Sequence, residues 1–508
     1  MSDPVSPVRW VKVLDQTRCI GCHACTTACK SENEVPVGVT RTYVKSVDVG
    51  TFPSVRRAFQ VTRCNQCADA PCVRACPTGA MYRRPDGIVD FDKSSCIGCK
   101  ACMAACPYDA IFINPEDHAA EKCNFCAHRI DVGLEPACVT VCPTEAIIVG
   151  DLNDPSSKVS QTIQRQSVAV RRPEKETRPG VYYKGAHQAT LDPLAARRPT
   201  GGLFAWATQG PPGPQTVTSG HPGRHNSSAA ALLSYDIPHV APWGWRVSLY
   251  TFTKGLAAGG FLVPLLLVLA GRITWTGPVM ALAAPLVALA ALGATGVLLV
   301  WDLKQPRRFT MIFTRPQWGS WIVRGAFIVS AYGAALVAAL VCGVVGSAAA
   351  EQVVAAFAAP LAVATACYTA YLFAQAKARD LWQSPVLAPH LLAQACVAGA
   401  AATVALTDAF SGARAAHAAA VVLAIAAATH LAFVAAEATT GHGTAHAHLA
   451  MTEILRGRYA RWFWPATLAA AVAVAAPVIG VVATPFALLG LLAYEHAYVQ
   501  GAQCVPLA

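Results

Sequence analysis

Sixteen cysteines between Cys19 and Cys142 are the residues whose spacing most clearly indicates chemistry. They form four sets of four. The first and third sets share the spacing C-x2-C-x2-C-x3-C, whereas the fourth set is stretched. In chain order the sets are Cys19, Cys22, Cys25 and Cys29; Cys64, Cys67, Cys72 and Cys76; Cys96, Cys99, Cys102 and Cys106; and Cys123, Cys126, Cys138 and Cys142. In three of the four sets a proline follows the last cysteine.

Thiolates at this spacing are typical of proteins that hold [4Fe–4S] clusters. Three close cysteines bind three irons of one cluster, and the fourth, before proline, binds the other cluster of a pair. Sixteen thiolates therefore predict four clusters. A disulfide framework would need an oxidising compartment, and residues 1–16 show neither an apolar export segment nor a twin-arginine pair. Zinc sites favour isolated C-x2-C pairs over such triplets.

Short apolar segments bracket the cysteine sets and are expected to form strands. They lie at residues 10–15, 88–92, 110–113 and 146–149. Alanines inside the first and third sets suit short helices that lie close to a cluster. We therefore expect an internal repeat of two ferredoxin-like modules, which together form an α+β domain over residues 1–150.

Composition divides the 508-residue chain sharply. Residues 151–242 are rich in Pro, Gly and Arg and are expected to be a linker, with residues 181–183 packed on the first domain. Residues 243–508 are dominated by Ala, Val and Leu, and the mean hydropathy of +0.40 is typical of a membrane protein. No basic run is interleaved with aromatic residues, which argues against nucleic-acid binding despite the net charge of +11.

The apolar part contains eight stretches of the length that spans a bilayer, roughly 17–25 residues. They lie at about 247–270, 278–301, 320–345, 353–375, 386–407, 415–437, 462–481 and 484–501. We expect an all-α bundle of eight transmembrane helices, in which Pro477 and Pro485 leave only a short turn between the last two. Its many Ala and Gly residues would allow close helix packing.

Basic residues gather in alternate loops, and such loops face the cytoplasm. The basic loops carry Lys304, Arg307, Arg308 and Arg315; Lys377 and Arg379; and Arg456, Arg458 and Arg461. The intervening loops hold at most one basic residue each. With an even number of helices, both termini and the cluster domain would lie on the cytoplasmic side of a bacterial inner membrane.

The cysteine pattern resembles the four-cluster electron-transfer subunit of the molybdopterin oxidoreductases, of the dimethyl sulfoxide and polysulfide reductase type. The resemblance covers about residues 8–185. It implies that the first set pairs with the fourth, and the second with the third. The implied ligand sets are Cys19, Cys22, Cys25 and Cys142; Cys29, Cys123, Cys126 and Cys138; Cys64, Cys67, Cys72 and Cys106; and Cys76, Cys96, Cys99 and Cys102.

The apolar part resembles a second family. The segment V-W-D-L-K-Q-P-R-R-F at 300–309, followed by W-G-S-W at 318–321, is similar to a signature of the NrfD-like quinone-reactive membrane anchors. Residues 368–372 and 380–385 match two further stretches. The resemblance implies a site for menaquinone or ubiquinone and no haem. Some members carry a quinone-binding histidine at the place where this chain has Tyr250. We expect His430, His442, His446 and His448 to be loop or helix-end residues.

Ionisable residues in the expected spans are candidates for the quinone site, because such residues are costly inside a membrane. A quinone needs a hydrogen-bond donor at each carbonyl, which Tyr or Lys supplies, and a route for two protons, which Asp supplies. The candidates are Tyr250, Lys254, Asp302, Tyr368 and Tyr371, with Glu437, Glu495 and His496 as weaker ones. Structural alternatives are snorkelling for Lys254, an ion pair with Arg307 or Arg308 for Asp302, and core packing for the tyrosines.

These features predict the fused electron-transfer and membrane-anchor subunit of a molybdopterin oxidoreductase. The substrate chemistry would occur on a separate catalytic subunit, so whether the chain is itself an enzyme stays open. Oxidation of sulfite or formate feeding the quinone pool is the first expectation, and reduction of a sulfur compound or dimethyl sulfoxide is the alternative. A proton-translocating module, similar to anchors of alternative complex III, is a further alternative, as is a cluster domain that serves soluble partners.

Overall fold

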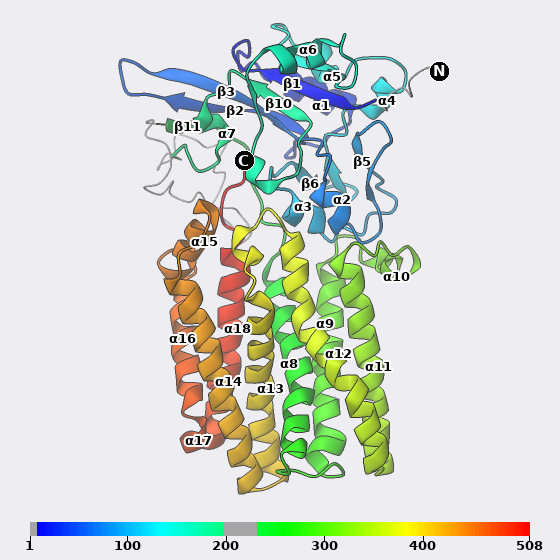
Figure 1. The fold of residues 1–508 in the computed structure, drawn as a ribbon, viewed down its shortest axis with the longest axis vertical. Helices are drawn as coiled ribbons and strands as arrows, with labels where there is room; N and C mark the ends of the chain where they lie inside the picture. The colour runs from blue at the N-terminus through cyan, green and yellow to red at the C-terminus, as the bar shows by residue number, and fades with distance from the viewer. Residues whose placement is uncertain (1–7, 198–230) are drawn as a thin grey trace.

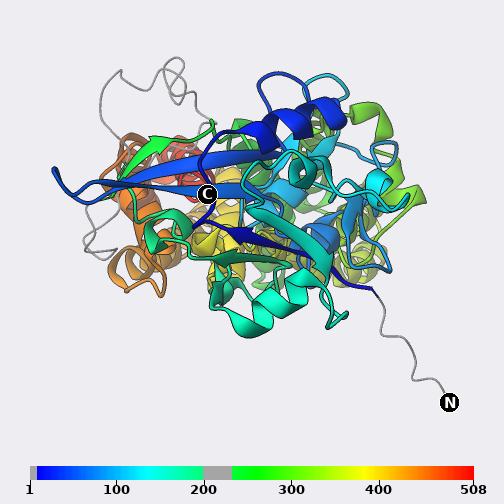
Figure 2. The same ribbon diagram turned by 90° about the horizontal axis from the view of Figure 1, so that it is seen from above.

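A computed structural model describes residues 8–197 and 231–508 (Figure 1). It has two parts: an N-terminal α+β domain, and a helical bundle whose one end this domain covers (Figures 1 and 2). The start of the chain at 1–7 and the Pro- and Gly-rich stretch 209–214 of the expected linker lie outside the described residues.

The main sheet of the N-terminal domain joins distant parts of the chain. Its strand order is β8 (Ile147–Asp151), β1 (Trp10–Asp15), β10 (Val181–Lys184) and β9 (Val168–Ala169). β1 is antiparallel to β8 and parallel to β10. The apolar side chains of β1 (Val11, Val13 and Leu14) are buried. Residues 181–184 are therefore a strand of this sheet.

Three smaller sheets complete the domain. The hairpin β2 (Thr42–Val49) and β3 (Arg56–Arg63), which the sequence did not predict, extends sideways and is joined by β11 (Ala231–Tyr235). Two short hairpins flank the third cysteine set. They are β4 (Met81–Arg83) with β5 (Val89–Phe91), and β6 (Ile111–Ile113) with β7 (Ala120–Lys122).

Short helices contain or directly follow cysteines of all four sets. They are α1 (Ala24–Glu32), α2 (Pro71–Ala75), α3 (Ala101–Ala105), α4 (Ala127–Ile130) and α5 (Ala137–Thr140); η1 (Pro173–Lys175), α6 (Lys158–Arg165) and α7 (Gln188–Leu191) pack around the sheets. The turns before α1 and α3 are alike. Gly21 and His23 have φ of 70° and 61°, and Gly98 and Lys100 have φ of 67° and 64°. This left-handed conformation is easy for glycine and uncommon for other residues. The repeat seen in the sequence is thus a repeat of backbone geometry.

The bundle consists of long helices that run between its two ends (Figure 1). They are α8 (Trp245–Leu269), α9 (Ala284–Asp302) extended by the π-helical η3 (Val279–Ala283), α11 (Trp321–Val345), α12 (Ala348–Gln375), α13 (Leu387–Phe410), α14 (Ala413–Thr439), α16 (Ala460–Val474) and α18 (Ala483–Gly501). Shorter elements join them: η4 (Pro306–Arg308), α10 (Met311–Thr314), η5 (Asp380–Gln383), α15 (Ala445–Leu455), α17 (Ala476–Ile479) and η6 (Gly480–Val482).

Within the described residues, seven helical segments are long and apolar enough to cross a membrane, which makes the chain a multi-pass membrane protein. The first six agree with the expected spans within a few residues. The expected count of eight is not confirmed, because α16 has only 15 residues. The last span begins at Ala476 rather than at 484, since the helix breaks at Ala475.

Glycines allow the central helices to approach closely. A Cβ atom on Gly399 of α13 would lie 2.0 Å from the carbonyl carbon of Gly259 in α8, and one on Gly259 would lie 1.7 Å from the carbonyl oxygen of Ala395. Such contacts between backbones are typical of small residues in membrane helices. They explain why α8 is mostly buried at the centre of the bundle.

The bundle end next to the N-terminal domain contains elements that the sequence did not predict. Helix α15 lies there, in the loop expected between the sixth and seventh spans, and Thr444 caps it by accepting a hydrogen bond from Ala447. The start of α8 and the end of α18 meet at the same end, where Gln503 accepts a hydrogen bond from the Trp243 backbone at 3.0 Å.

Candidate functional site

Two cavities in the N-terminal domain are each lined by four cysteines from different parts of the chain. One, with about 330 Å³ of empty space, is lined by Cys19, Cys22, Cys25 and Cys142, here called the Cys22 group. The other, with about 360 Å³, is lined by Cys76, Cys96, Cys99 and Cys102, here called the Cys99 group. In both, three closely spaced cysteines meet the last cysteine of another set.

The remaining eight cysteines gather in the same manner. Cys29 lies within electrostatic range of Cys123, Cys126 and Cys138 (the Cys29 group). Cys64, Cys67, Cys72 and Cys106 lie within range of one another (the Cys67 group). These four groups are the four sets that the family resemblance implied, while their role as cluster ligands stays a prediction.

The groups form a row. Cys25 of the Cys22 group lies near Cys138, Cys64 of the Cys67 group lies near Cys123, and Cys102 of the Cys99 group lies near Cys72. The order is therefore Cys22, Cys29, Cys67 and Cys99 groups. Among the sixteen cysteines Cys22 is the exposed one, which places the first group at the surface of the domain.

Several sulfur atoms accept hydrogen bonds, as thiolates do. Backbone amides of Ala146, Met81 and Gly98 donate to Cys142, Cys76 and Cys96 at 3.2, 3.4 and 3.4 Å. The Arg63 guanidinium donates to Cys138 at 3.1 Å. Burial raises the pKa of most of the sixteen thiols, for example that of Cys25 to about 11. Burial also acts on Cys138, but the charges of Lys12 and Arg63 outweigh it and lower its pKa to about 7.

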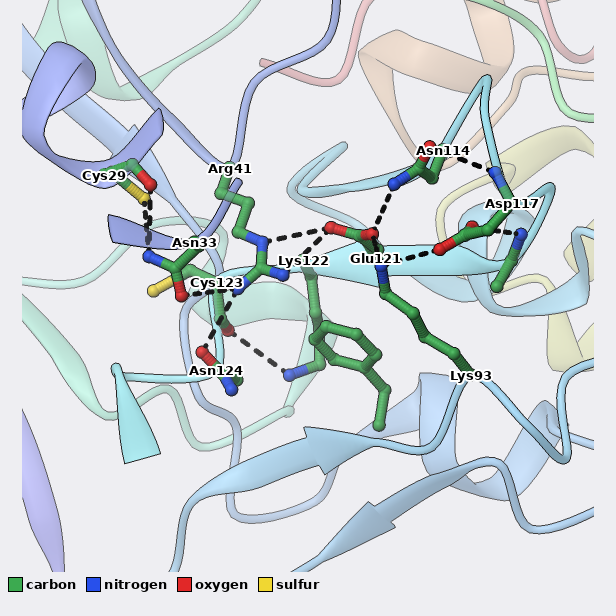
Figure 3. A network of polar contacts seen from close by, with 12 residues as sticks. Cys29, Asn33, Arg41, Lys93, Asn114, Asp117, Glu121, Lys122, Cys123 and Asn124 are labelled. Carbon is green, nitrogen blue, oxygen red and sulfur yellow. Dashed lines mark hydrogen bonds and ion pairs between the residues drawn. The ribbon is translucent and has the colours of Figure 1, made fainter. Parts of the chain in front are cut away.

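A buried polar network connects the Cys29 group to the inner half of the domain (Figure 3). Asn33 lies 3.7 Å from the sulfurs of both Cys29 and Cys126 and accepts a hydrogen bond from Arg41. Arg41 forms a buried ion pair with Glu121 at 2.9 Å. Glu121 also accepts from Asn114 at 2.6 Å and pairs with Lys93. The network fixes cationic and donor groups next to the sulfurs, which is how proteins tune clusters.

The donor set fits [4Fe–4S] clusters. Each group supplies four thiols, and the structure adds N–H donors and cations that stabilise their ionised form. In the described ranges, no three Cys, His, Asp or Glu side chains lie close enough to hold a single metal ion. This spacing suits a cubane, in which each cysteine binds a different iron, whereas one zinc ion would need all its sulfurs at about 2.3 Å.

A larger cavity lies between the Cys99 group and the bundle. It has about 1060 Å³ of empty space, part of which is open to the outside, and is lined mainly by apolar side chains of α8 to α12. Cys99, Trp243, Tyr250, Asp302 and Tyr368 also line it. An apolar pocket with a few polar groups is typical of sites for small organic molecules. Here such a molecule would lie next to a cysteine of the Cys99 group.

Three of the five predicted quinone-site residues, Tyr250, Asp302 and Tyr368, line this cavity. The expected partner of Asp302 was Arg307 or Arg308, but its carboxylate pairs with Lys100, the residue after Cys99, at 2.8 Å. Burial lowers the pKa of Lys100, and the charge of Asp302 opposes this. An ion pair between the two domains thus lies at the edge of the cavity.

The other two predicted residues lie elsewhere. Lys254 is buried outside the cavity lining, where its ammonium donates to Thr369 at 2.7 Å and to the Ala366 carbonyl at 2.9 Å. It does not snorkel to the interface. Tyr371 points outward, is 47% exposed and stacks on Trp321 at 4.5 Å. Tyr371 does not line the cavity, and its predicted role in the quinone site stays a prediction.

The family signature at 300–321 holds the loops of the Cys99 group. Lys304 and Gln305 donate through their backbone amides to Gly98 and Ile97, at 3.2 and 3.1 Å. The Arg308 guanidinium donates to the Cys96 carbonyl at 3.0 Å, and the Ser320 hydroxyl donates to the Ala75 carbonyl at 2.9 Å. The signature is therefore a docking element between the two parts of the chain.

Trp243 reinforces this junction from the start of α8. Its indole N–H donates to the Cys99 carbonyl at 3.1 Å. Its ring stacks on Trp382 at 5.7 Å, and Trp382 stacks on Phe373 at 4.3 Å. Sequence reasoning did not single out Trp243 as a functional residue, although a tryptophan at the start of the first span was a possible signal.

Sequence reasoning also missed a buried polar cluster in the bundle. His430 is not a loop or helix-end residue: it lies within α14 and is hydrogen-bonded to His390 of α13 at 3.0 Å. His390 lies 3.7 Å from Glu437, which also accepts from the Tyr494 hydroxyl at 3.3 Å. The signal for this cluster in the sequence was the presence of His390, His430 and Glu437 within two long apolar stretches.

Comparisons with known proteins agree with both parts of the chain. Residues 235–489 match the family described as "Polysulphide reductase, NrfD", residues 55–152 match "4Fe-4S dicluster domain", and residues 16–38 match "4Fe-4S binding domain".

Curated relatives match the N-terminal part. One tetrathionate reductase subunit, from Salmonella typhimurium, is 43% identical over 193 residues, which cover 37% of this chain and 77% of that protein. The arsenate respiratory reductase iron-sulfur subunit ArrB of a Shewanella species is 38% identical over 34% of this chain and 94% of its own length. The iron-sulfur subunit of a putative dimethyl sulfoxide reductase from Halobacterium salinarum is 42% identical over 37% and 82%.

The family match covers half of the chain, and the alignments cover more than two thirds of these relatives. The chain is therefore a member of the NrfD polysulphide reductase family that carries, ahead of its membrane bundle, the 4Fe-4S domains of reductase iron–sulfur subunits.

Proposed function

We propose that the chain transfers electrons between a separate catalytic subunit and a membrane quinone, through four [4Fe–4S] clusters. The observation that carries the proposal is the large cavity, which is lined both by Cys99 and by the polar residues Tyr250, Tyr368 and Asp302. A molecule in this cavity would be next to the last of the four cysteine groups. The four cysteine groups would connect this cavity to the exposed Cys22 group, where the catalytic subunit would bind.

Each cysteine group would hold one cluster, and each cluster would carry one electron at a time. The row starts at the exposed Cys22 group and ends at the Cys99 group. Buried cations such as Lys12, Arg63 and Lys122 lie along it and would stabilise added electrons. The domain would thus conduct between its outer surface and the bundle.

The outer surface would receive the catalytic subunit. Cys22 is exposed, and the neighbouring Ile20 and Val141 are exposed apolar side chains. The relatives are named as subunits of tetrathionate, arsenate and dimethyl sulfoxide reductases, which supports a molybdopterin-containing partner of the reductase type. These names favour electron flow from quinol to the partner over the expected oxidation of sulfite or formate.

The cavity would bind the quinone head group, whether ubiquinone or menaquinone. Tyr250 and Tyr368 would donate hydrogen bonds to its carbonyl oxygens, and Asp302 would exchange a proton. Apolar residues such as Leu299, Phe313 and Val329 would hold the ring and exclude water. A quinone carries two electrons and two protons, so the tyrosines orient it while the acid serves its protonation.

We further propose that the membrane domain, 243–508, crosses the bilayer eight times. The start of α8 and the end of α18 lie at the same end, which requires an even number of crossings. Helix α16 would then be a crossing of about 22 Å, from 1.5 Å per residue. Its antiparallel neighbour α18 runs alongside it (Figure 1).

The cluster domain would face the cytoplasm of a bacterial inner membrane, because the basic loops lie at its end of the bundle. Some of these basic residues also hold the chain together at this end, since Arg308 and Arg379 donate hydrogen bonds to carbonyl groups there.

Labelling of Ser411→Cys, at the opposite end of the bundle, tests the orientation. A membrane-impermeant maleimide should label it in right-side-out vesicles; labelling restricted to inverted vesicles would reverse the assignment.

A cavity-filling variant tests the function. Ala326 lines the cavity from α11, whereas Ala331 on the same helix is exposed on its outer surface. The full chain would be reduced with dithionite and mixed with a short-tailed quinone, and cluster reoxidation followed by absorbance. Ala326→Phe should slow reoxidation strongly and Ala331→Phe should not. Equal rates in wild type and Ala326→Phe would contradict a quinone site in this cavity.

A further inference from the structure

A group of buried ionisable side chains lies in the bundle outside the cavity. Its members are His390 of α13, His430 and Glu437 of α14, and Tyr494 and Glu495 of α18, all at most 6% exposed. Ionisable groups in membrane helices are costly and mark functional pathways by default. Neither the cysteine row nor the cavity lining accounts for them.

One end of this group reaches the cavity through Lys254. The Lys254 ammonium lies 5.0 Å from the centre of the Tyr368 ring, and Tyr368 lines the cavity. Thr369, which accepts a hydrogen bond from Lys254, also lies next to the hydroxyl groups of Tyr250 and Tyr368. Thr369 therefore links Lys254 to both tyrosines assigned to the quinone.

Glu495 continues the series away from the cavity. Its carboxylate interacts electrostatically with the Lys254 ammonium, and it accepts a hydrogen bond from the Thr251 hydroxyl at 2.6 Å. Tyr494, the adjacent residue on α18, donates to Glu437 at 3.3 Å. Its ring also lies against His430, with the ring centres 4.8 Å apart.

Glu437 and the two histidines extend the series to the end of the bundle next to the cluster domain. His390 Nε2 and His430 Nδ1 are 3.0 Å apart, so one ring donates and the other accepts. Glu437 lies two residues before the end of α14, and the half-buried His442 in the following loop contacts its backbone. His448, in α15, is exposed. The series thus lies between the cavity and the water at this end, and its two halves meet at the neighbouring residues Tyr494 and Glu495 of α18.

Two atoms along the series are buried and have no hydrogen-bond partner among the described residues: His390 Nδ1 and Glu437 Oε1. Buried polar atoms are rarely left unpaired, and water is their usual partner in polar sites. Imidazole and carboxyl groups bridged in this manner can pass protons, because each can both accept and donate one.

We propose that these side chains form a proton route between the quinone cavity and the water on the cluster side of the membrane. This inference rests on the proposed quinone function and adds the path of its protons. In the reductive direction a quinone takes two electrons from the reduced clusters and two protons from the route, and becomes a quinol. In the other direction the quinol gives two electrons to the clusters and two protons to the same route.

Two conservative variants test the route, Glu437→Gln and His430→Asn. Each keeps a polar side chain of similar size but removes a group that can both accept and donate a proton. Glu437 and His430 lie outside the cavity lining, so quinone binding itself should persist. His417→Asn is the matched control, because His417 lies on the same helix α14 but is exposed.

The full chain with all its clusters would be reduced and mixed with a short-tailed quinone, as for the cavity variant. Reoxidation should slow roughly 100-fold or more in Glu437→Gln and in His430→Asn, the size of effect typical of lost proton-transfer groups. The control should equal wild type. Azide, a small weak base that carries protons, should restore a large part of the rate in both variants. EPR should show the same clusters in all four proteins.

Each outcome is decisive. Wild-type rates in both variants would overturn the route, and so would a loss that azide does not restore, since that indicates a structural role. In proteoliposomes, proton uptake from the side opposite the cluster domain would also overturn it and would favour proton translocation. If the wild-type protein does not react with quinone at all, the proposed function fails instead.

Discussion

The two cysteine loops Cys19–Cys29 and Cys96–Cys106 have the same spacing and the same left-handed turn, but they have different neighbours. In the loop Cys19–Cys29, here called the outer loop, Ile20 is 58% exposed. Its counterpart Ile97, in the loop Cys96–Cys106 or inner loop, is 1% exposed. Gly21 packs against Phe59 of its own domain, and Gly98 packs against Lys304 of the bundle. The same structural unit thus serves once as a surface loop and once as a buried connection to the membrane.

The residues that follow the shared glycines differ accordingly. His23 of the outer loop lies edge-on to Tyr235, with ring centres 4.8 Å apart. Lys100, at the equivalent position of the inner loop, forms the ion pair with Asp302. Repetition therefore explains how each cluster would be held, while the differences explain where each end of the row would connect.

The largest expected effects come from removing one cluster at either end of the row of cysteine groups. Cys99→Ala and Cys22→Ala should each lose one of the four clusters in EPR spin counts, because each removes a thiolate ligand. Cys99→Ala should abolish reoxidation of the remaining clusters by quinone. Cys22→Ala should leave that reaction in place and abolish electron exchange with the catalytic subunit. Identical behaviour of the two variants would contradict a directed row.

The second prediction concerns two equivalent ion pairs. Glu32 and Asp109 each lie three residues after the last cysteine of their loop, and each pairs with a histidine, at 2.7 and 2.5 Å. His128, the partner of Glu32, is 51% exposed, whereas His239, the partner of Asp109, is 4% exposed. Burial acts to lower the pKa of His239, but Asp236 and Asp109 outweigh it and raise the pKa to about 9.

A raised pKa means that the folded protein binds the His239 proton more tightly than the unfolded chain, in which histidine titrates near pH 6.5. The resulting stabilisation, about 3 kcal/mol, is fully present below pH 6.5 and is lost as pH rises to about 9. Thermal unfolding of wild type should show this loss, and His239→Gln should not. His128→Gln, the exposed counterpart, should leave the pH profile of wild type unchanged; equal effects would refute the comparison.

The third prediction concerns the ion pair at the cavity. Asp302→Asn keeps the shape of the side chain but removes its charge and its exchangeable proton. Quinone-dependent reoxidation should slow roughly 100-fold or more with all four clusters retained, and Tyr368→Phe should also slow it. His23→Gln, at the position in the outer loop that corresponds to the partner of Asp302, should react at the wild-type rate. Unchanged turnover in both Asp302→Asn and Tyr368→Phe would remove them from the quinone site.

The smallest expected effect is that of Trp243→Phe. The phenyl ring can still stack on Trp382, but the hydrogen bond to the Cys99 carbonyl is lost, which typically costs about 1 kcal/mol. We expect a several-fold rise in the KM for quinone and a shifted reduction potential for one cluster in an EPR titration. Tyr235→Phe, beside His23 in the outer loop, is the control, and a shift of equal size there would show that the indole has no special role.

The sequence predicted best what depends on local spacing. Cysteine spacing, the strand at Trp10–Asp15 and the first six apolar spans could all be recognised, because each is a property of one contiguous segment. The turn at Ala475 lies inside the span expected at 462–481, because proline is tolerated in the first turn of a helix and a new helix begins just before Pro477. Helix α15 was missed because its alanines and histidines show no clear periodicity.

Contacts between distant segments were the main failure. The partner of Asp302 was sought nearby in the sequence, at Arg307 and Arg308, but Lys100 lies about 200 positions away on another domain. His390 and His430 lie on different helices, so their pairing has no signature in either segment. The outward position of Tyr371 could not be predicted, because a nearly uniform apolar span does not show which of its faces points inward.

The binding of a quinone in the bundle cavity, next to the Cys99 group, can be tested directly. A photoreactive azidoquinone would be added to the full chain and irradiated, and the labelled peptides identified by mass spectrometry. We predict labels on peptides that contain Tyr250, residues 299–313 or Tyr368, and their loss when excess unlabelled quinone competes. Competed labels at the opposite end of the bundle, or on α14 and α16 instead, would contradict the account.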